Sequence, residues 1–86
     1  MSAAATRLRL LSRPDCGLCK DMARDLAKLG LAFDTIDIEG DPGLLQSYGE
    51  AIPVLMHGDR EIARAPQTAE SLRRALERAG LLSAGR

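Results

Sequence analysis

The sequence predicts an α/β fold with the element order β-α-β-α-β-β-α and a central four-stranded mixed sheet flanked by helices. Two observations carry this prediction. Short stretches with apolar side chains at alternate positions, typical of strands, are separated by stretches with apolar side chains every three or four residues, typical of helices. A helix between the first two strands favours a parallel pair, and a tight turn between the last two favours a hairpin.

The strands follow from alternating side chains and from turn residues. Leu8 and Leu10 lie on one face of the first expected strand, with an arginine between them. Gly58-Asp59 is typical of the tight turn in a β-hairpin, so it connects the last two strands. The expected strands are residues 7–12, 31–38, 54–57 and 60–63.

The helices follow from their apolar faces and from the residues at their ends. Asp41 and Thr68 suit N-caps, and Gly30 and Gly80 suit the left-handed residue that follows a helix. The expected helices are residues 17–29, residues 42–48 and a last helix between Thr68 and Gly80. The expected buried face of the first helix consists of Leu18, Met22, Leu26 and Leu29.

Length and composition favour one small domain over residues 1–86, with a core of about residues 7–80. Twelve basic residues balance twelve acidic ones without a basic cluster, so we expect no nucleic-acid partner. Arg7 and Arg9 interrupt the N-terminal apolar stretch, and no stretch reaches membrane-spanning length. We therefore expect a cytoplasmic protein without a membrane partner, monomeric, with a frayed tail over residues 81–86.

The two cysteines of the chain, Cys16 and Cys19, form a C-x-x-C motif between the first strand and the first helix. In a reducing cytoplasm such a motif indicates redox chemistry more than a permanent structural disulfide. Two alternatives stay open. A zinc site built on the pair and His57 is one ligand short of four. Two small buried cysteines without chemistry are the other alternative.

The expected position of the motif assigns different roles to the two thiols. Cys16 lies at the start of a helix, where unpaired N–H groups and the helix dipole stabilise a thiolate. Its pKa is therefore expected to be lowered, which makes it the nucleophile. Cys19, one turn into the helix, is expected to be more buried and to resolve a mixed disulfide. Arg13 adds positive charge nearby, and Asp15 opposes it.

Pro53 is the second informative residue, because it stands directly before an apolar strand. A cis bond before it would turn the chain and present the backbone of Ile52 to an incoming peptide. A proline that begins an edge strand is the alternative.

Two segments resemble the glutaredoxin-like proteins of the thioredoxin superfamily, and the resemblance runs from about Arg7 to Ala79. SRPDCGLC, residues 12–19, resembles the glutaredoxin pattern Ser-Lys-x-x-Cys-Pro-Tyr-Cys, and AIPV, residues 51–54, resembles the superfamily's cis-proline loop. The resemblance implies a thioredoxin-like fold. It also implies a thiol–disulfide oxidoreductase of cell redox homeostasis and electron transport, which reduces protein or glutathione mixed disulfides.

The resemblance also implies roles for individual residues. Cys16 and Cys19 fall on the catalytic pair, and Arg13 falls on the basic residue that holds a glutathione carboxylate. Ile52 and a cis Pro53 fall on the loop opposite the pair. It implies no tightly bound cofactor, glutathione as co-substrate, and disulfide-bearing proteins and a reductase as partners.

Two departures from the family pattern bear on the function. ARAPQTAE, residues 63–70, replaces the family's Gly-Gly-x-Asp, so Thr68 and the following helix start are the donors offered to a glutathione carboxylate. CGLC, residues 16–19, lies partway toward the Cys-Gly-Phe-Ser of monothiol relatives. Two alternative functions therefore stand beside the enzyme: a dimer that binds an iron–sulfur cluster with glutathione, and a redox-silent binding module.

Overall fold

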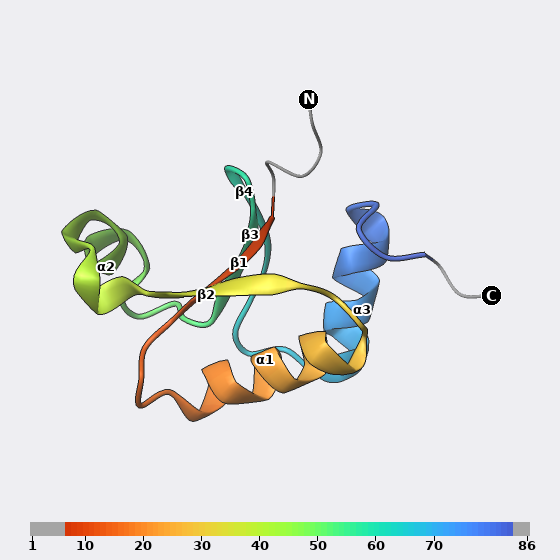
Figure 1. Cartoon of the computed structure of the whole chain (residues 1–86), viewed down its shortest axis with the longest axis horizontal. Helices are drawn as coiled ribbons and strands as arrows, with labels where there is room; N and C mark the ends of the chain where they lie inside the picture. The colour runs from red at the N-terminus through yellow and green to blue at the C-terminus, as the bar shows by residue number, and fades with distance from the viewer. Residues whose placement is uncertain (1–6, 84–86) are drawn as a thin grey trace.

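The computed structural model describes residues 7–83 and has the predicted element order, with one added 3₁₀ helix. Its sheet has the strand order β2-β1-β3-β4 (Figure 1). β1 pairs with β2 in parallel and with β3 antiparallel, and β3 and β4 form the predicted hairpin, so the sheet is mixed. The elements are β1 Leu8–Ser12, α1 Gly17–Lys28, β2 Phe33–Asp37, η2 Ile38–Gly40, α2 Pro42–Tyr48, β3 Val54–His57, β4 Arg60–Arg64 and α3 Ala69–Arg78.

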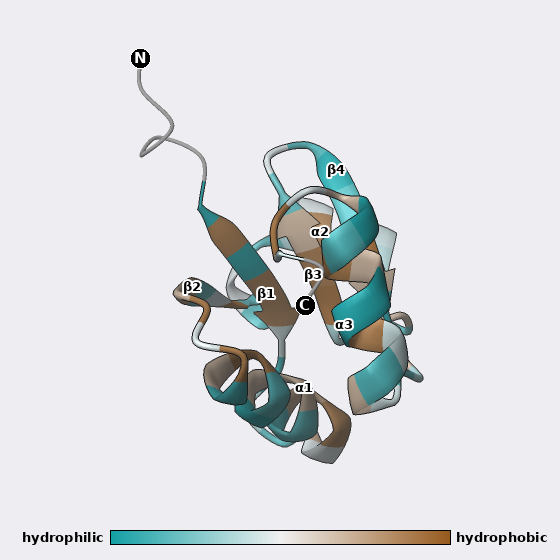
Figure 2. Cartoon of the chain, turned by 90° about the vertical axis from the view of Figure 1, so that its right-hand side faces the viewer, coloured by the Kyte–Doolittle hydropathy of each residue, from teal (hydrophilic) through white to brown (hydrophobic). Residues whose placement is uncertain are grey.

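The sheet is covered on both faces because its inner strands are apolar on both. α2 lies on one side of the strands and α3 on the other (Figure 1). Leu8 and Leu10 of β1 pack toward α1 and α3, whereas Leu11 packs toward α2. Figure 2 shows apolar bands along β1 that are interrupted by a polar band. The larger of the two core clusters consists of Leu8, Leu10, Met22, Leu26, Leu55, Ala63, Leu72 and Leu76.

Leu18 is a correction to the predicted buried face of α1, because its side chain is 55% exposed. Cys19, Met22 and Leu26 are the residues of α1 that are buried. At 100° per residue, Leu18 lies about 80° around the helix axis from Leu26. It therefore lies at the edge of the apolar face, in the first turn beside the cysteine pair.

The second strand is shorter than the sequence predicts. β2 ends at Asp37, and Ile38, expected in the strand, begins η2 with its side chain fully buried. The Asp37 side chain accepts a hydrogen bond from the Glu39 N–H at 2.9 Å, which stabilises a turn instead of an extended strand.

Both longer helices end at the predicted glycines. Gly30 and Gly80 each have a φ of 77°, which is the left-handed conformation. After α3, the Leu81 N–H donates to the Leu76 carbonyl at 2.9 Å, which completes the hydrogen-bond pattern of a Schellman cap. Leu81 and Leu82 pack against the core, so the expectation of a frayed tail is wrong for these two residues. Residues 84–86 lie outside the described range.

Candidate active site

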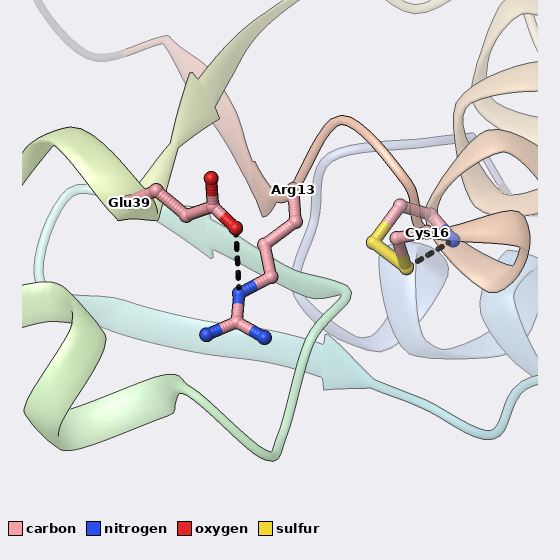
Figure 3. The surroundings of a disulfide bond; sticks show 4 residues. Arg13, Cys16 and Glu39 are labelled. Carbon is pink, nitrogen blue, oxygen red and sulfur yellow. Dashed lines mark hydrogen bonds and ion pairs between the residues drawn. A yellow bond between two sulfur atoms is a disulfide. The ribbon is translucent and has the colours of Figure 1, made fainter.

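The cysteine pair lies at the junction of β1 and α1, as the sequence predicts. Cys16 is the N-cap of α1, and its Sγ accepts a hydrogen bond from the Cys19 N–H at 3.0 Å. The two residues form a disulfide, with their Cα atoms 5.2 Å apart (Figure 3). Cys16 is partly exposed, whereas Cys19 is only 3% exposed.

This arrangement gives the two sulfurs different chemistry. The first turn of α1 contains no acidic side chain to oppose a negative charge. A Cys16 thiolate would be stabilised by the hydrogen bond from the Cys19 N–H and by the helix dipole. An incoming disulfide reaches Cys16 from solvent, while Cys19 is shielded among the residues of the core.

The loop before β3 lies against α1. The Ile52–Pro53 bond is cis, which confirms the prediction. Pro53 is buried and lines a small pocket of about 40 Å³ together with Leu18 and Met22. The Ala65 N–H donates to the Pro53 carbonyl at 3.0 Å, which ties this loop to the segment after β4. A second cis bond, Ala65–Pro66, was not predicted.

Arg13 lies between β1 and the cysteines, with its side chain beside η2 (Figure 3). Its Nε lies 3.5 Å from a Glu39 carboxylate oxygen, and this nitrogen is buried without a hydrogen bond. The side chain as a whole is 39% exposed. Arg13 lines a cleft of about 720 Å³ together with Glu50, Arg64 and Ala65. The predicted basic side chain therefore reaches an open space, although neither cysteine is among the residues that line it.

Arg64 lies on the same cleft and was not among the predicted site residues. Its Nε and Nη2 each donate to a Glu61 carboxylate oxygen at 2.6 Å. These hydrogen bonds, assisted by the attraction of the opposite charges, raise the pKa of Arg64 and lower that of Glu61. One signal pointed to it in the sequence: Arg64 belongs to the segment that replaces the family's Gly-Gly-x-Asp.

Thr68 is the N-cap of α3, as predicted, and its N–H and its side-chain oxygen both make hydrogen bonds there. The Thr68 N–H donates to Ser71 Oγ, and the Ser71 N–H donates back to Thr68 Oγ1, each at 3.0 Å. This capping box occupies the N–H groups of Thr68 and Ser71, two of those that the sequence offered to a carboxylate. Thr68 does not line the cleft of Arg13, and neither does Ile52, which packs against the core cluster beside α2.

Residues 7–83 contain no cluster of three His, Cys, Asp or Glu side chains placed to hold a metal ion. His57, the third ligand in the zinc alternative, lies half-buried at the end of β3 and pairs with Leu8 and Arg60 in the sheet. Within the same described range, no helix is long and apolar enough to cross a membrane.

Proteins with similar sequences occur in mycobacteria and in X. campestris. An uncharacterised protein of Mycobacterium tuberculosis is 38% identical over 64 residues, which cover 64% of this chain. The chain spans 66% of the length of that relative. A protein of X. campestris of known structure is 36% identical, with a TM-score of 0.75, over 83% of this chain and 96% of the other.

A complex of buckwheat glutaredoxin with glutathione has the same fold. It gives a TM-score of 0.59 at 23% identity, over 91% of this chain and 74% of the other. The thioredoxin-like fold is therefore confirmed. The family model described as Glutaredoxin-like domain (DUF836) matches residues 7–77. The chain belongs to this glutaredoxin-like family of the thioredoxin superfamily.

Proposed function

We propose that the protein is a dithiol thiol–disulfide oxidoreductase that reduces protein or glutathione mixed disulfides. The observation that carries the proposal is the asymmetry of the cysteine pair. Cys16 is partly exposed and caps α1, while Cys19 is buried behind it within disulfide distance. An inert buried pair would not require one sulfur to face solvent at a helix start.

The proposed reaction transfers two electrons from the dithiol to the substrate. The Cys16 thiolate attacks one sulfur of the substrate disulfide, a bond forms between them, and the other substrate sulfur leaves as a thiolate that takes up a proton. Cys19 then loses its proton and attacks Cys16 Sγ. The Cys16–Cys19 disulfide forms, and the second substrate sulfur leaves as a thiol after protonation.

Glutathione is the co-substrate that we propose for the return to the dithiol. Two glutathione thiols reduce the Cys16–Cys19 disulfide and leave as glutathione disulfide, so the electrons balance. The cleft beside Arg13 supports this proposal, since a guanidinium can hold a carboxylate through paired hydrogen bonds. Pro53 lies beside Leu18, in the first turn of α1, which supports a role for the loop of Ile52 and Pro53 in contacting the substrate backbone. We propose the cytoplasm as the compartment, because reducing conditions there would keep the dithiol available.

Turnover of a small glutathione mixed disulfide, coupled to glutathione reductase and NADPH, tests the proposal. The wild-type protein should oxidise NADPH, and Cys16→Ser should abolish this activity. Cys19→Ser should instead accumulate a mixed disulfide between Cys16 and its substrate, visible as an added mass. The proposal fails if the wild-type protein neither turns over nor exchanges its disulfide with any thiol.

A further inference from the structure

The start of α3 is partly occupied by its own hydrogen bonds, which use the N–H groups of Thr68 and Ser71. Besides the capping box of Thr68 and Ser71, the Ser71 hydroxyl donates to Gln67 Oε1 at 2.7 Å, and Gln67 Nε2 donates to the Arg64 carbonyl at 3.0 Å. Glu70 also places a carboxylate in the first turn of α3. A carboxylate that bound the Thr68 or Ser71 N–H would have to displace these bonds, and anywhere in this turn it would approach the like charge of Glu70.

The Arg64 guanidinium has N–H groups that do not bond to Glu61. A guanidinium has five N–H groups, and Glu61 occupies one at Nε and one at Nη2. Three N–H groups therefore remain for a second acceptor. The pair with Glu61 also fixes the orientation of the guanidinium, which reduces the entropy lost when a ligand binds.

The cleft has a charge pattern of its own. Arg13 and Arg64 line it together with one carboxylate, that of Glu50. The Nε of Arg13 is buried 3.5 Å from a Glu39 carboxylate oxygen, so it is not itself open to a ligand in the cleft. A volume of about 720 Å³ lies within the range of small-molecule sites.

We propose that Arg64 is a specificity-determining residue, which binds a carboxylate of the substrate disulfide across the cleft from Arg13. The preferred substrates are small peptide disulfides with at least two carboxylates, and an ammonium group on such a substrate faces Glu50. Recognition by the arginine side chain replaces recognition by the start of α3. This inference rests on the proposed exchange function and names its substrate class.

The test compares small disulfides of different charge. Reduced protein, freed of other thiols, is mixed with glutathione disulfide (anionic), hydroxyethyl disulfide (neutral) or cystamine (cationic), and the second-order rate of thiol loss is measured. In Arg64→Ala the rate with glutathione disulfide should fall about fivefold, while the other two rates change less than about twofold. Arg64→Lys, which keeps the charge without the fork, should fall in between.

Arg74→Ala is the matched control, because Arg74 is also an exposed arginine paired with a carboxylate but does not line the cleft. It should leave all three rates unchanged. Raising the salt concentration should reduce the wild-type preference for the anionic disulfide. Equal rates in wild type and Arg64→Ala would overturn the inference and leave the exchange function standing. No reaction with any of the three disulfides would overturn the exchange function itself.

A binding measurement separates recognition from chemistry. S-methylglutathione, which has the carboxylates but no reactive sulfur, is titrated into the oxidised protein and followed by NMR. The side-chain Nε–H signals of Arg13 and Arg64 should shift, and Arg64→Ala should weaken the affinity about fivefold. An acidic peptide without a thiol is the second ligand. If it binds more tightly than S-methylglutathione, or if the Arg64 signal does not move, the inference is wrong.

Discussion

The backbone N–H of Cys19 donates a hydrogen bond to the sulfur of Cys16 across 3.0 Å. One sulfur atom thereby has two tasks, since it caps α1 and forms the exposed half of the disulfide. The two tasks support each other, because the N–H that satisfies the cap also stabilises negative charge on the sulfur during exchange.

The cap predicts a stability difference between two variants that both lack the disulfide. Serine is a good N-cap and alanine a poor one, so Cys16→Ser should be more stable than Cys16→Ala by about 1 kcal/mol. The order should reverse at Cys19, where serine would bury a hydroxyl at a site that is 3% exposed. Urea unfolding of the four variants measures both differences. The same order at both positions would contradict the capping role.

The helix start predicts a lowered pKa for the Cys16 thiol in the reduced protein. The rate of iodoacetamide alkylation of Cys19→Ser should rise with a midpoint below about 8.5, the value of an ordinary cysteine. Cys16→Ser provides the control, because the buried Cys19 thiol has no such donor and should react slowly. A midpoint for Cys16 at or above the ordinary value would show that the helix start does not activate it.

The capping box predicts a structural role for Thr68. Thr68→Ala removes the acceptor of the Ser71 N–H and should destabilise the protein by about 1 kcal/mol, while KM for a glutathione mixed disulfide stays within about twofold. Urea unfolding and the coupled turnover assay measure the two quantities. If KM rises several-fold without a loss of stability, Thr68 binds the carboxylate that the family resemblance assigned to it.

Most of the fold follows from the sequence because its signals are local. Gly30 and Gly80 end helices through a backbone conformation that other residues rarely adopt, and Asp41 caps α2 with hydrogen bonds to two N–H groups. Leu18 was misplaced for the opposite reason. Helical spacing shows that a residue borders the apolar face, but only the packed neighbours decide whether it is covered.

A pair of alanine variants on α1 tests that distinction. Leu26 is fully buried and Leu18 is 55% exposed. Leu26→Ala should therefore cost about 2–5 kcal/mol, and Leu18→Ala should stay within about 0.5 kcal/mol. Thermal and urea unfolding in the oxidised state measure both, so the disulfide is constant. A comparable loss in both variants would mean that Leu18 is covered in solution.

The candidate site was only partly predictable. Cys16, Cys19 and the cis bond before Pro53 belong to short contiguous motifs, so spacing and resemblance found them. Arg64 is far from Arg13 in sequence, and the two reach one cleft only through the pairing of β1, β3 and β4. A replaced motif shows that a family feature is missing, but it does not show which side chain takes its place.

The pair of Glu61 and Arg64 predicts a pH-dependent contribution to stability. The hydrogen bonds from Arg64 lower the pKa of Glu61, burial opposes them by raising it, and the attraction of the Arg64 charge lowers it again, so the pKa lies below its ordinary value. A carboxyl group whose pKa is lowered by folding stabilises the protein above its unfolded pKa, about 4.3, and loses this contribution as the pH falls through the folded pKa.

Glu61→Gln should therefore be slightly less stable than wild type at pH 7, and this difference in the free energy of unfolding should disappear as the pH falls below about 4. Because the Glu61 side chain is 35% exposed, the gap should also shrink in high salt. Urea midpoints between pH 3 and pH 7 measure it, with Arg64→Ala as the control that lacks the partner. A gap that stays constant over this range would show that the ion pair contributes nothing, and that Arg64 is oriented by other contacts.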